Sequence, residues 1–229
     1  MTADAQILLA MRQGGDVGVS GAALAQQLGI SRAAIWNHIQ ELRRCGYDIE
    51  ASPHYGYRLR GVPDALHADD LLSRLKLGRI VGRDIRVFHE TTSTNDVVER
   101  LAKDDVAEGI AVFAESQTRG RGRLGRTWTS PAGKGLWFSV LLRPKIPPQA
   151  ATQLTVLSAV AVARSIERVT GLSPEIKWPN DIVFGARKCA GILIELGAEL
   201  DHIRHAVRSE EHTSELQSLA YLVCRLLLE

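Results

Sequence analysis

Apolar side chains recur with the period of a helix across residues 20–45. Residues 22–28 carry them on one face, and residues 32–42 repeat them at spacings of four and three, so we predict two helices that each bury one stripe. Gly29 supplies the tight turn between these helices, and Ser31 can cap the second one. The buried stripes consist of Leu24 and Leu28, followed by Ile35, Ile39 and Leu42.

A period of two replaces the helical period after residue 46. Residues 47–60, YDIEASPHYGYRLR, place two short alternating runs around a Pro/Gly turn, which is typical of a β-hairpin. A helix-turn-helix followed by a hairpin is a winged helix, so we predict a DNA-binding domain over residues 1–63, with a plain helical hairpin or a protein-interaction module as the alternatives. Trp36 could instead pack on the wing. The side chains expected to face the major groove of DNA are Ser31, Arg32, Ala33, Trp36, Asn37 and Gln40.

Strand-like runs dominate the remainder of the chain, with helices between and after them. We expect one long Ala-rich helix over residues 150–171 and a shorter helix after the TTSTND segment. This order predicts an α/β or α+β sheet domain over residues 64–207. The expected strands lie in residues 83–90, 108–117, 135–144, 174–184, 188–196 and 200–207.

The composition is that of an ordinary soluble protein, with 45% hydrophobic and 24% charged residues and a net charge of +2. Any positive surface must therefore be local. The three cysteines are far apart and form no zinc or disulfide pattern, which predicts a reducing, cytoplasmic location. No apolar run reaches the roughly 20 residues of a membrane span, so we expect no membrane partner.

Residues 119–128, RGRGRLGRTW, contain four arginines and three glycines. Glycine allows the backbone to approach a ligand closely and leaves a loop mobile when it is empty. Arginine's planar fork binds oxyanions through two parallel hydrogen bonds, which explains why lysine is not used here. Because the stretch occurs once and lies between two strands, we interpret it as a phosphate or carboxylate cradle rather than a nucleic-acid tract or a solvated loop.

Further polar groups stand beside this cradle in the expected fold. Residues 92–94 lie where a strand meets a helix N-terminus, which favours an anion or a polar ligand head, although a simple helix cap is the alternative. The KWPND segment adds Lys177, Asn180 and Asp181, and Lys188 follows before a run of small residues. A lysine in such a tight setting needs an anionic partner. Together the cations imply a ligand with phosphate and carboxylate groups.

Four motifs occur in the order in which biotin protein ligases carry them, and the N-terminal winged helix resembles that of the bifunctional members, which also repress the biotin operon. The resemblance covers about residues 1–207. It implies an α+β catalytic domain with a mixed sheet, like that of class II aminoacyl-tRNA synthetases. The motifs are TTSTND, ESQTRGRGRLGRTWTSP, KWPNDIVF and KCAGILIEL.

The resemblance implies a two-step reaction that uses biotin as substrate together with ATP and Mg²⁺. The carboxylate of biotin attacks the α-phosphate of ATP, which gives biotinyl-5′-AMP and pyrophosphate. A lysine of a biotin carboxyl carrier protein then attacks the mixed anhydride and releases AMP. The adenylate would also act as corepressor and promote a homodimer that binds operator DNA. The alternative is a ligand-sensing repressor without ligase activity.

The resemblance also implies residue roles. Lys188 would bridge the biotin carboxylate and the α-phosphate, and Arg123 would close over both, so these are the expected catalytic residues. Trp128 would stack near adenine, and Asp181 is the one group expected to serve a magnesium ion, with no fixed metal site. The expected biotin site comprises Ser93, Thr94, Asn95, Gln117, Gly120, Arg121, Arg123, Lys188 and Gly191. The expected ATP site comprises Arg123, Arg126, Trp128, Lys177, Asn180 and Asp181.

The family pattern stops at Val207, where the family continues with a Gly-x-Gly-x-Asn strand, further helices and a small SH3-like barrel. Residues 208–229 begin RSEEHTSELQS, which resembles the translation of a sequencing-adapter oligonucleotide. We therefore expect a non-native tail and an incomplete catalytic domain whose cut sheet edge exposes backbone groups. The tail could still form an amphipathic helix through Leu216, Leu219, Val223 and Leu226.

Overall fold

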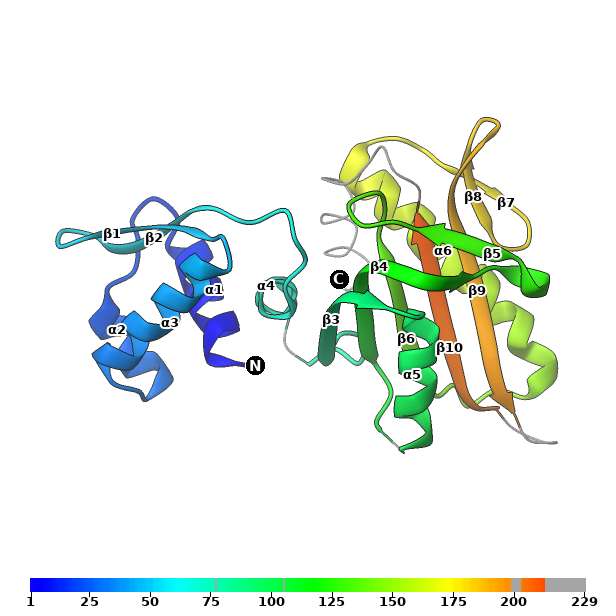
Figure 1. The fold of residues 1–229 in the computed structure, drawn as a ribbon, viewed down its shortest axis with the longest axis horizontal. Coiled ribbons are helices and arrows are strands. Elements are labelled where there is room, and N and C mark those ends of the chain that lie inside the picture. Colours follow the sequence, from blue (N-terminus) through cyan, green and yellow to red (C-terminus); the bar gives the residue numbers. More distant parts are fainter. Residues whose placement is uncertain (77, 105, 199–202, 213–229) are drawn as a thin grey trace. The chain divides into compact units, whose positions relative to one another are not determined.

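The computed structural model describes residues 1–76, 78–104, 106–198 and 203–212 (Figure 1). The chain divides into two compact units, Met1–Arg74 and a second unit that begins at Leu75. The amphipathic helix expected over residues 216–226 lies outside the described residues.

The first unit contains the predicted helix-turn-helix. Ser31 caps α3 by accepting a hydrogen bond from the backbone N–H of Ala34 at 3.1 Å, and Gly29 ends α2 in the left-handed conformation with φ of 69°. Leu24 and the predicted stripe of α3 are buried, while Leu28 is partly buried against the same core. The helices are α1 (Ala3–Gly14), α2 (Gly21–Leu28), α3 (Arg32–Arg44) and α4 (Ala68–Arg74).

The predicted wing is present as an antiparallel hairpin of β1 (Asp48–Ser52) and β2 (Gly56–Gly61). Val19 forms a bridge with Tyr57 of β2, which ties the wing to the segment between α1 and α2. A helix-turn-helix with an attached wing is therefore the fold of this unit.

The short helix α4 belongs to the first unit, which extends beyond Pro63. Asp70 of α4 is fully buried and forms ion pairs with Arg12 of α1 and, at 3.0 Å, with Arg74. A buried carboxylate requires such partners because the charge has lost its water. The pair with Arg12 thus fixes α4 against α1.

The second unit is built on one eight-stranded mixed sheet, as the sequence predicts. Its order is β3-β4-β6-β10-β9-β8-β7, and β5 pairs with β4 beside this path. Only β3 and β4 run parallel among the described pairs. The strands are β3 (Asp84–Thr91), β4 (Ile110–Arg121), β5 (Thr127–Ser130), β6 (Trp137–Leu142), β7 (Glu175–Lys177), β8 (Asp181–Phe184), β9 (Arg187–Ala198) and β10 (Ile203–His212).

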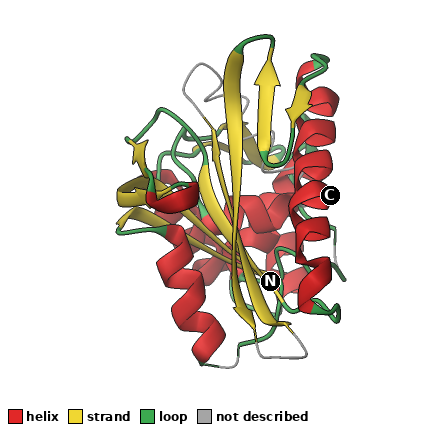
Figure 2. Ribbon diagram, turned by 90° about the vertical axis from the view of Figure 1, so that its right-hand side faces the viewer, coloured by secondary structure: helices red, strands yellow, loops and turns green. Residues whose placement is uncertain are grey.

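Two helices cover opposite faces of this sheet (Figure 2). Helix α5 (Thr94–Lys103) buries Val97 and Val98 against β4, β6 and β10, while α6 (Ala151–Thr170) buries Val162 and Ile166 against β8 and β9. In the part of the chain that the structure describes, no helix is long and apolar enough to cross a membrane. The face that carries α5 also carries the candidate site.

Two expectations from the sequence need correction. The stretch 119–128 is not a single mobile loop, because β4 continues to Arg121 and pairs with β5 from Thr127 onward. Only a short tip, with the 3₁₀ turn Arg123–Gly125, connects these strands. The expected cut edge is also wrong, because β10 lies between β6 and β9 and its backbone pairing extends from Ile203 to His212. Strand β10 is interior because both neighbours offer it hydrogen-bonding edges.

We predict that Asp70→Ala destabilises the first unit by about 3–5 kcal/mol, since it leaves two guanidinium groups beside a buried site without their counter-ion. Hydrogen exchange of the α1 amides under native conditions measures this free energy of opening. The exposed Asp64 supplies the matched control, because Asp64→Ala should leave exchange unchanged. Equal exchange in both variants would show that Asp70 does not hold α4 on α1.

Candidate ligand-binding and DNA-binding sites

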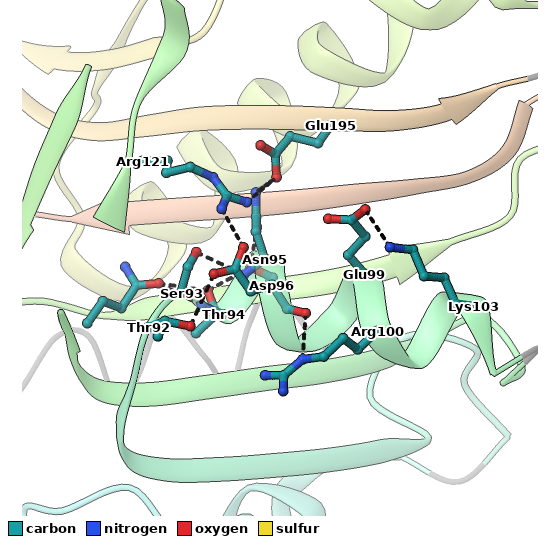
Figure 3. A network of polar contacts seen from close by, with 12 residues as sticks. Thr92, Ser93, Thr94, Asn95, Asp96, Glu99, Arg100, Lys103, Arg121 and Glu195 are labelled. Carbon is teal, nitrogen blue, oxygen red and sulfur yellow. Dashed lines mark hydrogen bonds and ion pairs between the residues drawn. The ribbon is translucent and has the colours of Figure 1, made fainter. Parts of the chain in front are cut away.

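The N-terminus of α5 forms a buried polar network (Figure 3). Ser93, Thr94 and Asn95 are each 3% exposed or less. The Oε1 atom of Gln117 on β4 accepts hydrogen bonds from the backbone N–H of Thr94 at 2.8 Å and from its hydroxyl at 3.2 Å. The Nε2 atom of Gln117 donates to Ser130 of β5 at 3.0 Å. The predicted biotin residues of α5 and β4 therefore lie together.

Ser139 of β6 extends this network towards β9. Its hydroxyl lies 2.7 Å from that of Thr94 and donates to Oδ1 of Asn95 at 2.6 Å. The Nδ2 atom of Asn95 then donates to Glu195 of β9 at 2.6 Å. Ser139 and Glu195 were not predicted from the motifs, although Glu195 is the acidic residue in the otherwise apolar segment 189–196.

Arg121 connects the same network to the β4–β5 hairpin. Its guanidinium forms ion pairs with Asp96 of α5 and, at 2.9 Å, with Glu195. Burial disfavours the charged guanidinium, but the hydrogen bonds to Glu195 and Asp96 outweigh it and raise the pKa of Arg121. The sequence interpretation expected the arginines to need an anion from a ligand, whereas protein carboxylates already neutralise this one.

Lys188 and the KWPND turn form a second cluster. The Nζ atom of Lys188 donates to Asp181 at 2.7 Å and lies 4.9 Å from the centroid of the Trp128 ring, within cation–π range. Arg123 donates to the amide oxygen of Asn180 at 3.0 Å. Asn180 also holds the KWPND turn against β9, because its side-chain amide donates to the backbone oxygen of Ile192 at 3.1 Å.

One small pocket brings together six of the predicted site residues. It holds about 30 Å³, far below the roughly 300 Å³ of a small-molecule site. Among the predicted ATP residues, Lys177 and Arg126 are exposed and do not line this pocket. The predicted residues that line it are Arg121, Arg123, Trp128, Asn180, Lys188 and Gly191.

At two glycines of the site, neighbouring atoms leave no room for a side chain. A Cβ on Gly120 would lie 2.5 Å from the backbone oxygen of Trp128, and a Cβ on Gly191 would lie 2.7 Å from Nζ of Lys188. Gly120 thus permits close pairing of β4 with β5. Gly191 leaves room for the lysine.

The described residues contain no group of three His, Cys, Asp or Glu side chains that could hold a metal ion. Asp181, the residue expected to serve magnesium, stands as a single carboxylate with Lys188 on one oxygen.

The outer face of α3 is open to solvent. Asn37 is exposed, Gln40 is partly buried, and Trp36 is 55% exposed, so Trp36 is not buried under the wing. A groove of about 950 Å³ runs between α3 and the wing, with Trp36 and Tyr55 in its lining. The other predicted DNA-facing residues, Ser31, Arg32 and Ala33, are also exposed.

Each of the two units contains a segment that matches a known protein family. Residues 87–205 match the biotin/lipoate A/B protein ligase family, and residues 5–58 match a helix-turn-helix domain. The chain is 42% identical over 196 residues to the bifunctional ligase/repressor BirA of Bacillus subtilis, covering 85% of this chain and 60% of that protein. It is 38% identical over 178 residues to BirA of Escherichia coli, covering 77% of this chain and 53% of that one.

A solved structure shares the fold of the second unit. The biotin protein ligase from Aquifex aeolicus in complex with biotin and ATP is 28% identical, with a TM-score of 0.51 over 63% of this chain and 67% of that chain. The present chain thus spans little more than half the length of the two bifunctional relatives.

We predict that Gly120→Ala separates β5 from β4, because backbone must move to admit the new methyl group. Hydrogen exchange of residues 119–130 should rise, since the pairing between Gly120 and Trp128 is lost. Gly122→Ala is the matched control, because the nearest atoms to its Cβ lie 3.6 Å away. A similar rise in both variants would mean that hairpin flexibility, not the contact at Gly120, sets the exchange.

Proposed function

The chain belongs to the biotin/lipoate A/B protein ligase family, and on that premise we propose that it joins biotin to a carrier protein at the expense of ATP. The observation that carries the proposal is the pocket in which Lys188, Arg121 and Arg123 converge beside the polar N-terminus of α5. The product of the first step would be biotinyl-5′-AMP, and a lysine of a biotin carboxyl carrier protein would accept the biotinyl group in the second.

Lys188 and Arg123 would offset the charge repulsion that opposes the first step. A carboxylate oxygen forms a bond to the α-phosphorus of ATP while the bond from that phosphorus to the bridging oxygen of pyrophosphate breaks, so one anion must approach another. Lys188 is preorganised for this role by Asp181 and the Trp128 ring. Arg123, held to the neutral amide of Asn180, can turn its guanidinium to the phosphate.

The network at α5 suits the neutral polar ring of biotin. Ser93, Thr94, Asn95 and Gln117 offer hydroxyl and amide groups rather than net charge. In addition, the Nε atom of Arg121 and the Nε1 atom of Trp128 are buried without a hydrogen-bond partner among the described residues. A buried donor left unpaired costs about 1–3 kcal/mol, so an acceptor supplied by the ligand would relieve that cost.

The nucleotide would lie towards the KWPND turn, with Asn180 and Trp128 beside it. The exposed side chains of Arg126 and Lys177 would contact its phosphates as the hairpin closes. The donor set fits a magnesium ion that arrives on the phosphates, because such ions keep water and take one or two protein carboxylates, here Asp181. The ion would supply further neutralisation of phosphate charge.

A second function, repression of transcription, is favoured by the exposed face of α3 beside the wing. Side chains near the start of such a helix read base edges in the major groove. We propose that the protein binds operator DNA in the cytoplasm as a homodimer when biotinyl-5′-AMP is bound. Transfer of labelled biotin to a carrier protein distinguishes the ligase from a ligand-sensing repressor without catalysis.

We predict that Lys188→Gln lowers the rate of pyrophosphate release from ATP and biotin far more than it lowers biotin affinity, because the charge is needed most in the transition state. The loss should be about a hundredfold or more for one charged contact. Arg187→Gln removes the adjacent, exposed cation and should leave the rate unchanged. Pyrophosphate release at an undiminished rate in the Lys188 variant would exclude this role, and no release by the unaltered chain would favour the non-catalytic repressor.

We predict that Asn37→Ala weakens binding to a duplex selected from a random library by about tenfold, because a base contact is lost. Binding to unselected DNA should change little, since phosphate contacts dominate it. Fluorescence anisotropy at several salt concentrations measures both, with the exposed Gln13→Ala on α1 as control. Equal weakening on both duplexes would place Asn37 at the phosphate backbone instead.

A further inference from the structure

Glu195 occupies a position in the network that none of the recognised motifs assigns to a function. Its Oε2 atom accepts two hydrogen bonds, from Nδ2 of Asn95 at 2.6 Å and from the terminal nitrogen of Arg121 at 2.9 Å. One oxygen on β9 thereby joins the start of α5 to the base of the β4–β5 hairpin (Figure 3). Its side chain is 39% exposed, so it lies at the rim of the site rather than in the core.

The contacts through Glu195 close a ring of hydrogen bonds. From Arg121 the ring passes through Glu195, Asn95, Ser139 and the hydroxyl of Thr94, and the backbone N–H of Thr94 returns it to β4 by donating to Gln117. Because Arg121 and Gln117 belong to the same strand, a shift of α5 relative to β4 must break or strain a bond of this ring. A connected polar network of this kind responds as a unit.

Charge explains why Arg121 serves as an attachment point. Two carboxylates, Asp96 and Glu195, face its single guanidinium, so its charge is already offset within the protein. Arg123 is in a different situation, since it contacts the neutral amide of Asn180. Arg121 thus anchors the hairpin, and Arg123 can turn to the negative charge of a ligand.

We propose that Glu195 is a positioning residue that couples closure of the β4–β5 hairpin to the polar N-terminus of α5. Arg121, Arg123 and Trp128 of the hairpin line a pocket of about 30 Å³, and in this proposal the hairpin moves to admit a larger ligand such as a nucleotide. Through Glu195, occupation of the α5 network orders the base of the hairpin. The part of this proposal that concerns biotin rests on the proposed function, whereas the coupling itself does not.

The ligand-free protein tests the coupling directly. In Glu195→Ala, hydrogen exchange should rise about tenfold both in residues 93–96 and in residues 119–128, because a charge-assisted bond is lost on each side. Glu195→Gln, which keeps an acceptor oxygen but loses the charge, should give an intermediate rise and covers the case that the alanine variant does not fold. The control is Glu99→Ala, which removes an α5 carboxylate paired with Lys103 and should leave both segments unchanged.

Biotin supplies the second arm of the experiment. In the unaltered chain, biotin should slow exchange in both segments, while in Glu195→Ala it should protect residues 119–128 less than it does in the unaltered chain, because only the ion pair of Arg121 with Asp96 still joins them to α5. A rise confined to one segment in the ligand-free variants, or equal protection of the hairpin by biotin in Glu195→Ala, would overturn the coupling. If biotin protects neither segment of the unaltered chain, the proposed function fails, and the ligand-free comparison still decides the role of Glu195.

Discussion

The ion pairs of Arg121 with Asp96 and Glu195 hold the β4–β5 hairpin, which lines the candidate site, in place. They fix the end of β4, and β4 in turn sets the register of β5, in which Trp128 lies opposite Gly120. That register carries the Trp128 ring to Lys188, and the small volume beside Gly191 lets the lysine reach it. The ion pairs of Arg121 therefore help to place the aromatic ring beside the amine of Lys188, which Asp181 also holds.

Arg121, Arg123 and Lys188 each have a polar partner within the protein. Lys188 is paired with Asp181, and Arg123 is hydrogen-bonded to Asn180. A ligand phosphate or carboxylate must compete with these partners, so its binding free energy reflects the difference between two sets of contacts rather than the sum of new ones. Such partial neutralisation also keeps the cations from repelling one another while the site is empty. Specificity for an anion of the right shape is a natural result of that competition.

The sequence predicted much of the architecture because its strongest signals are local. The spacing of Ile35, Ile39 and Leu42 was enough to predict α3. The alternation of residues on both sides of a Pro/Gly turn was enough to predict the wing. The site residues of the motifs also lie together, although the roles assigned to them stay predictions. What escaped prediction was non-local: Glu195 and Ser139 join the network through strand pairing that no motif encodes. The hairpin was missed because its glycines and arginines have low strand propensity, and pairing of β4 with β5 overrides it.

The central place of β10 has a consequence for how the second unit forms. Every other strand that the structure describes in this sheet precedes it in the chain, yet β10 separates the group β3-β4-β6 from the group β9-β8-β7. During synthesis those two groups emerge first, with their facing edges unpaired until residues 203–212 leave the ribosome. Unpaired edges are templates for pairing with other chains, so the nascent protein passes through a stage open to aggregation. Insertion of this one strand converts two half-sheets into the single surface on which α5 and β9 meet.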